Sequence, residues 1–204
     1  MKTESFLLRG DLCYSRDSTH LETVAGGVLL CLEGRCAGVF PQVPEQYRGL
    51  PWYDFSGKLV VPGLADLHVH ASQYAYRGLG MDMELLDWLN TNAFPEEAKF
   101  ADLDYAKRAY GLFVEDLRRG ATTRAAVFAT LHGPATRVLM ELLEASGLCA
   151  FVGKVNMDRN SPDILREENA AASARATVEW LEQTAGKYRH VKPILTPRFI
   201  PSCS

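Results

Sequence analysis

The residues with the clearest chemical potential lie in the stretch from Leu64 to His70, which reads LADLHVH. Side chains alternate between the two faces of a β-strand, so Asp66, His68 and His70 share one face if this stretch is a strand. At a rise of about 3.3 Å per residue, the two histidine Cα atoms lie ~7 Å apart, close enough for both imidazoles to bind one metal ion. Asp66 is placed to accept a hydrogen bond from an imidazole N–H and so to orient the ring. The spacing predicts half of a metal site. The alternative is two histidines that are simply exposed or packed on a half-buried strand.

The elements that must position these histidines alternate between strand and helix from Pro62 onward. Strands are predicted at residues 64–69, 122–131, 149–157 and 191–199, and helices at 83–89, 104–119, 134–146 and 164–188. Strands alternating with helices of about ten to twenty residues predict βα units around a parallel sheet. In that class, side chains at the carboxyl ends of the strands carry the chemistry, and both histidines fall there.

Residues 1–60 have a different pattern, made of short strands and turns. An apolar segment at 6–12 ends in a turn, and strands at 26–32 and 36–40 flank a predicted hairpin turn. Residues 53–61 are predicted to form another hairpin. A segment of this size makes a small β layer rather than an independent core.

The composition excludes several classes of protein. The 204 residues contain 22 Lys+Arg and 25 Asp+Glu, a formal net charge of -3, with no basic run that would favour nucleic acid. No segment approaches the ~18 uncharged apolar residues of a membrane span, and the start is too short and too charged for a signal peptide. Five cysteines without a CxxC motif predict reduced thiols. We expect a cytoplasmic protein that binds neither nucleic acid nor a membrane.

The segment from Asp54 to His70, with Val61-Pro62-Gly63 before the histidine strand, resembles the start of the barrel in the amidohydrolase superfamily. Further blocks resemble the guanine deaminase family within it, over nearly the whole chain but only about the first half of those enzymes. These blocks are 70–74 (HASQY), 85–89 (LLDWL), 94–97 (FPEE), 151–158 (FVGKVNMD) and 191–199 (VKPILTPRF). Residues 75–78 (AYRG) also resemble the wider deaminase and chlorohydrolase branch, which leaves another heterocycle as an alternative substrate.

The resemblance implies an α/β fold, a (β/α)8 TIM barrel of which residues 61–204 hold about the first four βα units, with residues 1–60 as the N-terminal β-sandwich part. It implies hydrolytic deamination of guanine to xanthine and ammonia, in purine catabolism or salvage, by a homodimer. It also implies one zinc ion per active site, with His68 and His70 as two of its ligands and Asp66 as the residue that holds a ligand ring. Zinc lowers the pKa of a bound water to about 7.

Four further residues are implied as substrate contacts. Gln73 offers both a donor and an acceptor to the edge of the base. Arg198 donates to acceptor atoms of guanine, Phe199 stacks on the ring or walls it, and Trp88 closes the pocket. Each has an ordinary alternative: a solvated loop for Gln73, a surface ion pair for Arg198, and hydrophobic packing for the two aromatic residues.

Other polar residues are predicted to lie outside catalysis. Glu96 and Glu97 follow Phe94-Pro95 in a predicted loop, and neither is assigned the role of general acid. Lys154 is predicted to be structural or to line the pocket, and His132 either faces the same end of the sheet or is exposed. In the family, the catalytic Glu and the remaining ligands, a His and an Asp, come from later strands, so we expect them beyond residue 204.

Three explanations for half a barrel remain open. The chain is the N-terminal half of a longer deaminase, or it is completed by a second polypeptide or a symmetry-related copy, or it is a non-catalytic remnant that acts as an interaction module. The first is favoured because the chain stops directly after its fourth predicted strand, which leaves one edge and one face of the sheet uncovered.

Overall fold

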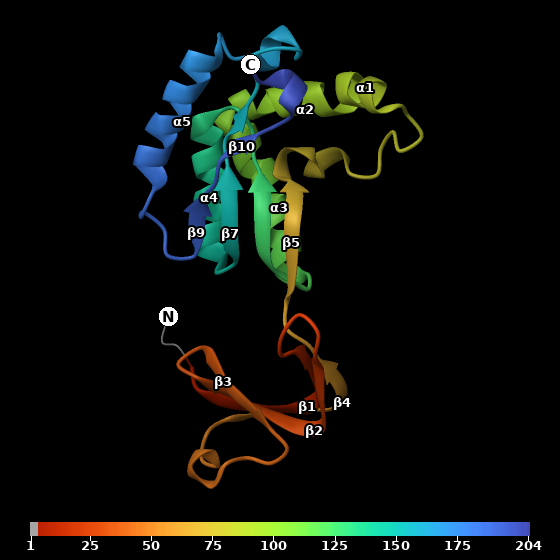
Figure 1. The fold of residues 1–204 in the computed structure, drawn as a ribbon, viewed down its shortest axis with the longest axis vertical. Coiled ribbons are helices and arrows are strands. Elements are labelled where there is room, and N and C mark those ends of the chain that lie inside the picture. Colours follow the sequence, from red (N-terminus) through yellow and green to blue (C-terminus); the bar gives the residue numbers. More distant parts are fainter. Residues whose placement is uncertain (1–3) are drawn as a thin grey trace. The chain divides into compact units, whose positions relative to one another are not determined.

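The computed structural model describes residues 4–204, and the chain divides between Pro62 and Gly63 into two compact units. The first unit is a four-stranded sheet of β1 (Phe6–Ser15), β2 (Leu21–Leu32), β3 (Arg35–Phe40) and β4 (Trp52–Val60). The strand order is β3-β2-β1-β4; β2 is antiparallel to both its neighbours, while β4 runs parallel to β1 (Figure 1). Its small core is built on Leu7, Val28 and Leu30.

The predicted hairpin at 53–61 is wrong, because both halves of that segment pair with β1. Asp54 is opposite Arg9 and Leu59 is opposite Asp11, and the register shifts between them. Gly57 has a φ of 73°, which a glycine adopts without steric cost at such a bulge. The turn predicted after residue 12 is likewise a bulge, between Gly10 and Leu12, and β1 continues to Ser15.

The second unit is a parallel sheet with helices, as the sequence predicts. Its main sheet has the order β5-β6-β7-β9, all parallel, and β8 pairs with β10 in a separate parallel ribbon. The strands are β5 (Leu64–His70), β6 (Thr122–Phe128), β7 (Cys149–Gly153), β8 (Val155–Asn156), β9 (Val191–Pro193) and β10 (Thr196–Pro197). The helices are α1 (Leu85–Trp88), α2 (Phe94–Ala98), α3 (Leu103–Arg119), α4 (Gly133–Ser146) and α5 (Ala170–Thr184).

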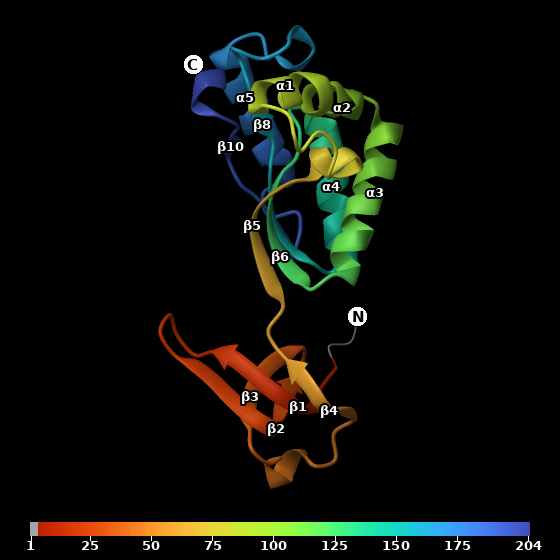
Figure 2. The same ribbon diagram turned by 90° about the vertical axis from the view of Figure 1, so that its right-hand side faces the viewer.

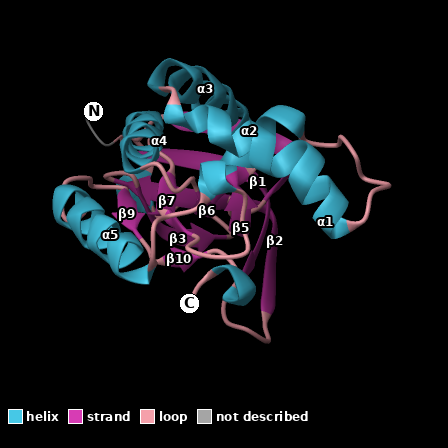
Figure 3. Cartoon of the chain, turned by 90° about the horizontal axis from the view of Figure 1, so that it is seen from above, coloured by secondary structure: helices cyan, strands magenta, loops and turns pink. Residues whose placement is uncertain are grey.

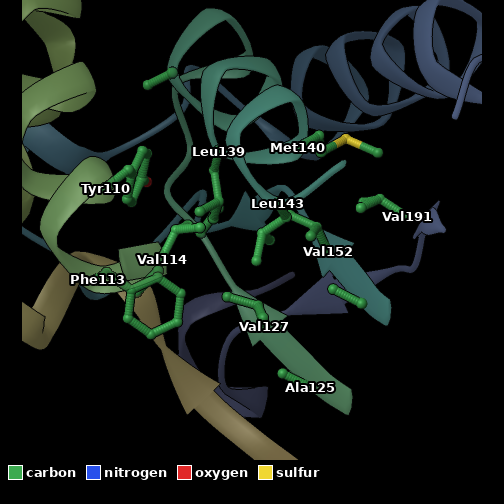
Figure 4. Packing of buried hydrophobic residues seen from close by; sticks show 14 of the residues in the cluster. Tyr110, Phe113, Val114, Ala125, Val127, Leu139, Met140, Leu143, Val152 and Val191 are labelled. Atoms are coloured by element: carbon green, nitrogen blue, oxygen red, sulfur yellow. The ribbon is translucent and has the colours of Figure 1, made fainter. Parts of the chain in front are cut away.

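Helices α3, α4 and α5 form an arc on one side of the parallel strands (Figure 3). The core of this unit lies between them and the sheet, where Tyr110 and Phe113 of α3 and Leu139 and Leu143 of α4 meet Val127 of β6 (Figure 4). These five side chains are at most 2% exposed. Because the helices cover this face, the opposite face of β5, with its two histidines, is left available for a site.

Local signals explain where the helices begin and end. Asp102 accepts hydrogen bonds from the backbone N–H groups of Asp104 and Tyr105 and so caps α3, and Gly147 ends α4 at a φ of 80°. The helix predicted at 164–188 is wrong at both ends, because α5 covers only Ala170–Thr184. Asn169 caps α5 by accepting a hydrogen bond from the backbone N–H of Ala172. Glu167, just before it, accepts hydrogen bonds from Lys154 and Met157 and lies outside the helix.

No helix within residues 4–204 is both long enough and apolar enough to cross a membrane.

Candidate active site

A cavity of about 1090 Å³ opens at the carboxyl end of β5, within the second unit. This is slightly above the range of ~300–1,000 Å³ usual for small-molecule sites. Helices α1 and α2 lie above the strand ends here (Figure 2). The six predicted metal and substrate residues all line the cavity: His68, His70, Gln73, Trp88, Arg198 and Phe199. The fold thus brings together residues from three separate segments of the sequence.

The two histidines lie side by side in the lining of this cavity, with their rings in contact. Their Nε2 atoms are 3.2 Å apart, and the ring of Phe128 on the neighbouring strand β6 lies 4.7 Å from the ring of His70 and 4.8 Å from that of His68, measured between centroids. Two Zn–N bonds of about 2.0–2.1 Å at a tetrahedral angle would place the two nitrogens roughly 3.3–3.4 Å apart. The observed geometry fits two ligands of a single ion.

The electrostatics of His70 also suit a metal ligand. Burial, with smaller contributions from the charge of Arg198 and from His68, lowers the pKa of His70 to about 4. Its imidazole is therefore neutral at physiological pH and keeps a lone pair for a metal. The Nδ1 atom of His70 is buried, and no atom of residues 4–204 hydrogen-bonds to it.

Asp66 lies beside the histidines, but it hydrogen-bonds to the backbone of His68 rather than to an imidazole ring. Its Oδ1 accepts a hydrogen bond from the backbone N–H of His68 at 3.1 Å, which fixes the chain at the ligand position. Residues 4–204 contain no group of three or more His, Cys, Asp and Glu side chains that would hold a metal ion. The described part of the chain thus supplies two histidine ligands.

Arg198, which follows β10, lines the cavity together with Phe94, and it contacts Glu97, which is not among the lining residues. We call Arg198, Phe94 and the supporting Glu97 the arginine side. The Nη1 of Arg198 donates to Oε2 of Glu97 in α2, and its guanidinium carbon lies 5.5 Å from the centroid of the Phe94 ring. The two charged side chains are only 8% and 1% exposed. The surface ion pair considered from the sequence is therefore excluded, and Glu97 lies in a helix, not in the predicted loop.

The remaining predicted contacts are held to different degrees. Trp88 ends α1, and its Nε1–H donates to the backbone oxygen of Leu79 at 3.0 Å while its ring packs on Tyr76. Gln73 lies in the half-buried 3-10 turn Ala71–Tyr76 that follows the histidine strand. Phe199 is 57% exposed, so it forms an open rim of the cavity.

Lys154 and His132 lie away from the cavity lining. The Nζ of Lys154 is buried and donates to Glu167 at 2.6 Å, and Glu167 also accepts from the N–H of Met157 and from the hydroxyl of Ser173. Lys154 is thus structural, as one of the two sequence-based alternatives has it. His132 precedes α4 and is half-buried, and burial together with the charge of Lys154 lowers its pKa.

Sequence reasoning missed Glu97 and Phe128. Glu97 carries no local sign of its role, because its partner is 101 residues away. Phe128 had a weak sign, since it occupies the predicted second strand, whose parallel pairing with β5 places it opposite His70.

The parallel α/β unit carries its two histidines at the carboxyl end of its first strand, which is where α/β-barrel enzymes keep their active sites. Residues 59–204 match the family model described as "Amidohydrolase family", and the chain belongs to that family. Among curated proteins, it is 42% identical to a guanine deaminase of Dictyostelium discoideum over 152 residues and 38% identical to that of Homo sapiens over 162 residues. These matches cover 74% and 79% of this chain but only 34% and 35% of those proteins. The resemblance seen in the sequence is thereby confirmed.

Solved structures give the same result over the whole chain. The guanine deaminase from C. acetobutylicum with bound guanine superposes with a TM-score of 0.92 at 45% identity, covering 98% of this chain and 48% of that one. A triazine hydrolase variant superposes with a TM-score of 0.80 at 15% identity, which shows a shared fold. The chain therefore spans about half the length of these barrel enzymes, as expected for the first βα units of an amidohydrolase barrel.

Proposed function

We propose that the natural polypeptide carrying this chain hydrolyses guanine to xanthine and ammonia, and that these residues supply part of its metal site and part of its purine pocket. The observation that carries the proposal is that His68 and His70 face one another in the same cavity as Gln73 and Arg198. The likeness to guanine deaminases, including one with guanine bound, supports guanine as the substrate.

The metal we propose is one zinc ion, held by Nε2 of His68 and Nε2 of His70. The spacing of these two atoms, 3.2 Å, fits ligands of one ion, and the low pKa of His70 keeps its ring neutral. When bound, zinc supplies a hydrolytic nucleophile at neutral pH by acidifying water. Phe128 packs on both rings and so limits their rotation, and Asp66 holds the backbone of His68. These contacts orient the ligand pair before any ion binds.

The other residues of the cavity position the purine. Deamination replaces the amino group at C2 with oxygen, so the base must present C2 towards the histidine pair. Gln73, in the turn that follows the histidine strand, contacts the edge of the base in this proposal with a donor and an acceptor. Arg198 donates to the acceptor edge, where guanine carries its carbonyl oxygen and N7. Trp88 and Phe199 wall the cavity and help to exclude water from the plane of the ring.

We also propose the wider setting that the resemblance implies. Residues 1–60 form the N-terminal β-sandwich part and residues 61–204 the first half of the barrel of a cytoplasmic, homodimeric enzyme of purine catabolism. The remaining His and Asp ligands and the catalytic Glu then come from chain outside this sequence.

The test is to isolate the natural polypeptide from its source, measure its intact mass and metal content, and assay it with guanine as substrate. We expect a mass about twice that of the 204 residues, one zinc ion per chain, and equal amounts of xanthine and ammonia. If the polypeptide leaves guanine intact but hydrolyses another amino- or chloro-substituted heterocycle, the family assignment stands and guanine is the wrong substrate.

A further inference from the structure

The arginine side of the cavity contains a pair of opposite charges that are almost completely removed from water. Glu97 is 1% exposed at its side chain and Arg198 is 8% exposed. Taking two such charges out of water costs several kcal/mol per ion, and the attraction between them often does no more than offset that cost. Folding alone therefore gives little reason for this pair. Arg198 lines the cavity while Glu97 does not, which suggests that Glu97 acts toward a ligand through Arg198.

Glu97 has one charged contact. Its Oε2 accepts from Arg198, while its Oε1 is buried and has no hydrogen-bond partner within the described chain. The hydroxyls of Tyr76 and Tyr110 are also buried without partners there, and the charge of Glu97 adds to the effect of burial in raising the pKa of both phenols. Glu97 is thus buried, and within residues 4–204 Arg198 is the only cation with which it forms an ion pair.

The guanidinium of Arg198 is hydrogen-bonded to Glu97 through one nitrogen, and its other N–H groups have no protein acceptor within residues 4–204. A guanidinium has five N–H donors in a rigid plane. Within residues 4–204, Nη1 of Arg198 is the only side-chain donor of this residue with a protein acceptor, and the side chain lines the cavity. Its backbone N–H donates to the carbonyl oxygen of Asn156, which anchors the residue at its base. Arg198 is therefore held at its backbone N–H, and its guanidinium is held at one nitrogen and lies near the Phe94 ring.

We propose that Glu97 is a positioning residue that orients Arg198, so that the remaining N–H groups of the guanidinium meet the carbonyl edge of a purine and reject a purine with an amino group at the same place. This inference rests on the proposed function for the identity of the ligand. Glu97 does not touch the substrate; it acts through Arg198. Because the guanidinium has donors and no acceptor, a 6-amino group placed against it leaves donors facing donors, which disfavours binding.

The test uses two purines that cannot be deaminated at C2 because they lack an amino group there. Hypoxanthine carries a carbonyl at C6 and adenine carries an amino group at C6. Their dissociation constants are measured by calorimetry on the natural full-length polypeptide with its metal. We expect the unsubstituted protein to prefer hypoxanthine by at least about tenfold, the scale of a lost hydrogen bond to a charged group. In Glu97→Gln we expect that preference to fall to less than about threefold.

A matched control lies beside it on the same helix. Glu96 makes an ion pair with Lys99 rather than with Arg198, so Glu96→Gln makes the same chemical change one residue away. We expect Glu96→Gln to keep the full preference for hypoxanthine. If Glu97→Gln does not fold because it leaves a buried cation unpaired, Glu97→Gln with Arg198→Met removes both charges, and this double variant is expected to fold and bind the two purines about equally.

The proposal is overturned if the unsubstituted protein shows no preference, or if Glu97→Gln or the double variant keeps it. Guanine turnover, measured on the same preparations, separates this result from the proposed function. If the protein turns over guanine and Glu97→Gln keeps the preference for hypoxanthine, the proposed function stands and the role of Glu97 is wrong. If the preference depends on Glu97 but the protein does not turn over guanine, the role of Glu97 stands and the proposed function is wrong.

Discussion

The two sides of the cavity differ in how they are assembled. The histidine side comes from two residues two positions apart on β5, whereas the arginine side joins residues 101 positions apart. On the histidine side, His68 is exposed and His70 partly buried; on the arginine side, both charged groups are almost fully buried. The difference shows that a local pattern is enough to bring the two proposed metal ligands together, while the proposed substrate contact Arg198 is held by a residue from a distant part of the chain.

The largest expected effect lies on the histidine side. Replacing both His68 and His70 with alanine removes the two proposed zinc ligands, so zinc content should fall to background. Guanine turnover should fall by on the order of 10³-fold or more, because a metal contributes several kcal/mol to hydrolysis. Metal analysis and a xanthine assay on the natural polypeptide measure both. His20→Ala, at an exposed histidine paired with Asp17, serves as the control. Wild-type zinc content and turnover in the double variant would remove the metal assignment.

The next prediction compares the arginine side with a buried pair outside the cavity. Lys154→Met leaves Glu167 without its cation, so the free energy of unfolding should fall by about 3 kcal/mol. Lys154 does not line the cavity, so zinc content and the preference for hypoxanthine should not change. Urea denaturation measures the stability, with the exposed Lys99→Met expected within ~0.5 kcal/mol of the unsubstituted protein. A loss of purine preference in Lys154→Met would show that the two buried pairs do not differ in role.

Arg198→Ala tests the arginine side directly. It should lower kcat/KM for guanine by an amount equivalent to about 1–3 kcal/mol of transition-state stabilisation, the scale of an unpaired buried polar group. Steady-state kinetics on the natural polypeptide checks this, with zinc content as the control for an intact histidine side. An unchanged kcat/KM would make Arg198 a purely structural residue.

The same contrast explains which parts of the fold and of the site could be predicted from the sequence. Period-two spacing is enough to place His68 and His70 together, and helix signals predict α3 and α4 within a residue of their observed bounds. The role of Glu97 was not accessible, because nothing near it in sequence identifies a partner 101 residues away. The helix predicted to begin at 164 failed for a related reason: Glu167 is recruited by Lys154 and Met157, and Asn169 then starts α5.

The smallest expected effect concerns the scaffold behind the site. Partial burial acts to raise the pKa of Glu144, but hydrogen bonds from the backbone N–H groups of His190, Arg189 and Val191 outweigh it and lower that pKa. A lowered pKa in the folded state adds stability above the unfolded value of about 4.3, and this stability is lost as the pH falls through the folded value.

Glu144→Gln should therefore cost roughly 1 kcal/mol at pH 7, and the difference from the unsubstituted protein should shrink as the pH falls below about 4. Urea denaturation across that pH range measures it. A difference that is constant with pH would show that the ionised carboxylate of Glu144 does not hold the start of β9.

The most direct test of the account is a crystal structure of the natural polypeptide with guanine, with anomalous scattering recorded at the zinc edge. The account predicts one zinc peak about 2.0–2.1 Å from Nε2 of both His68 and His70, with the carbonyl edge of guanine against Arg198 and Glu97 behind it. A zinc peak elsewhere, or guanine bound away from this cavity, would contradict it.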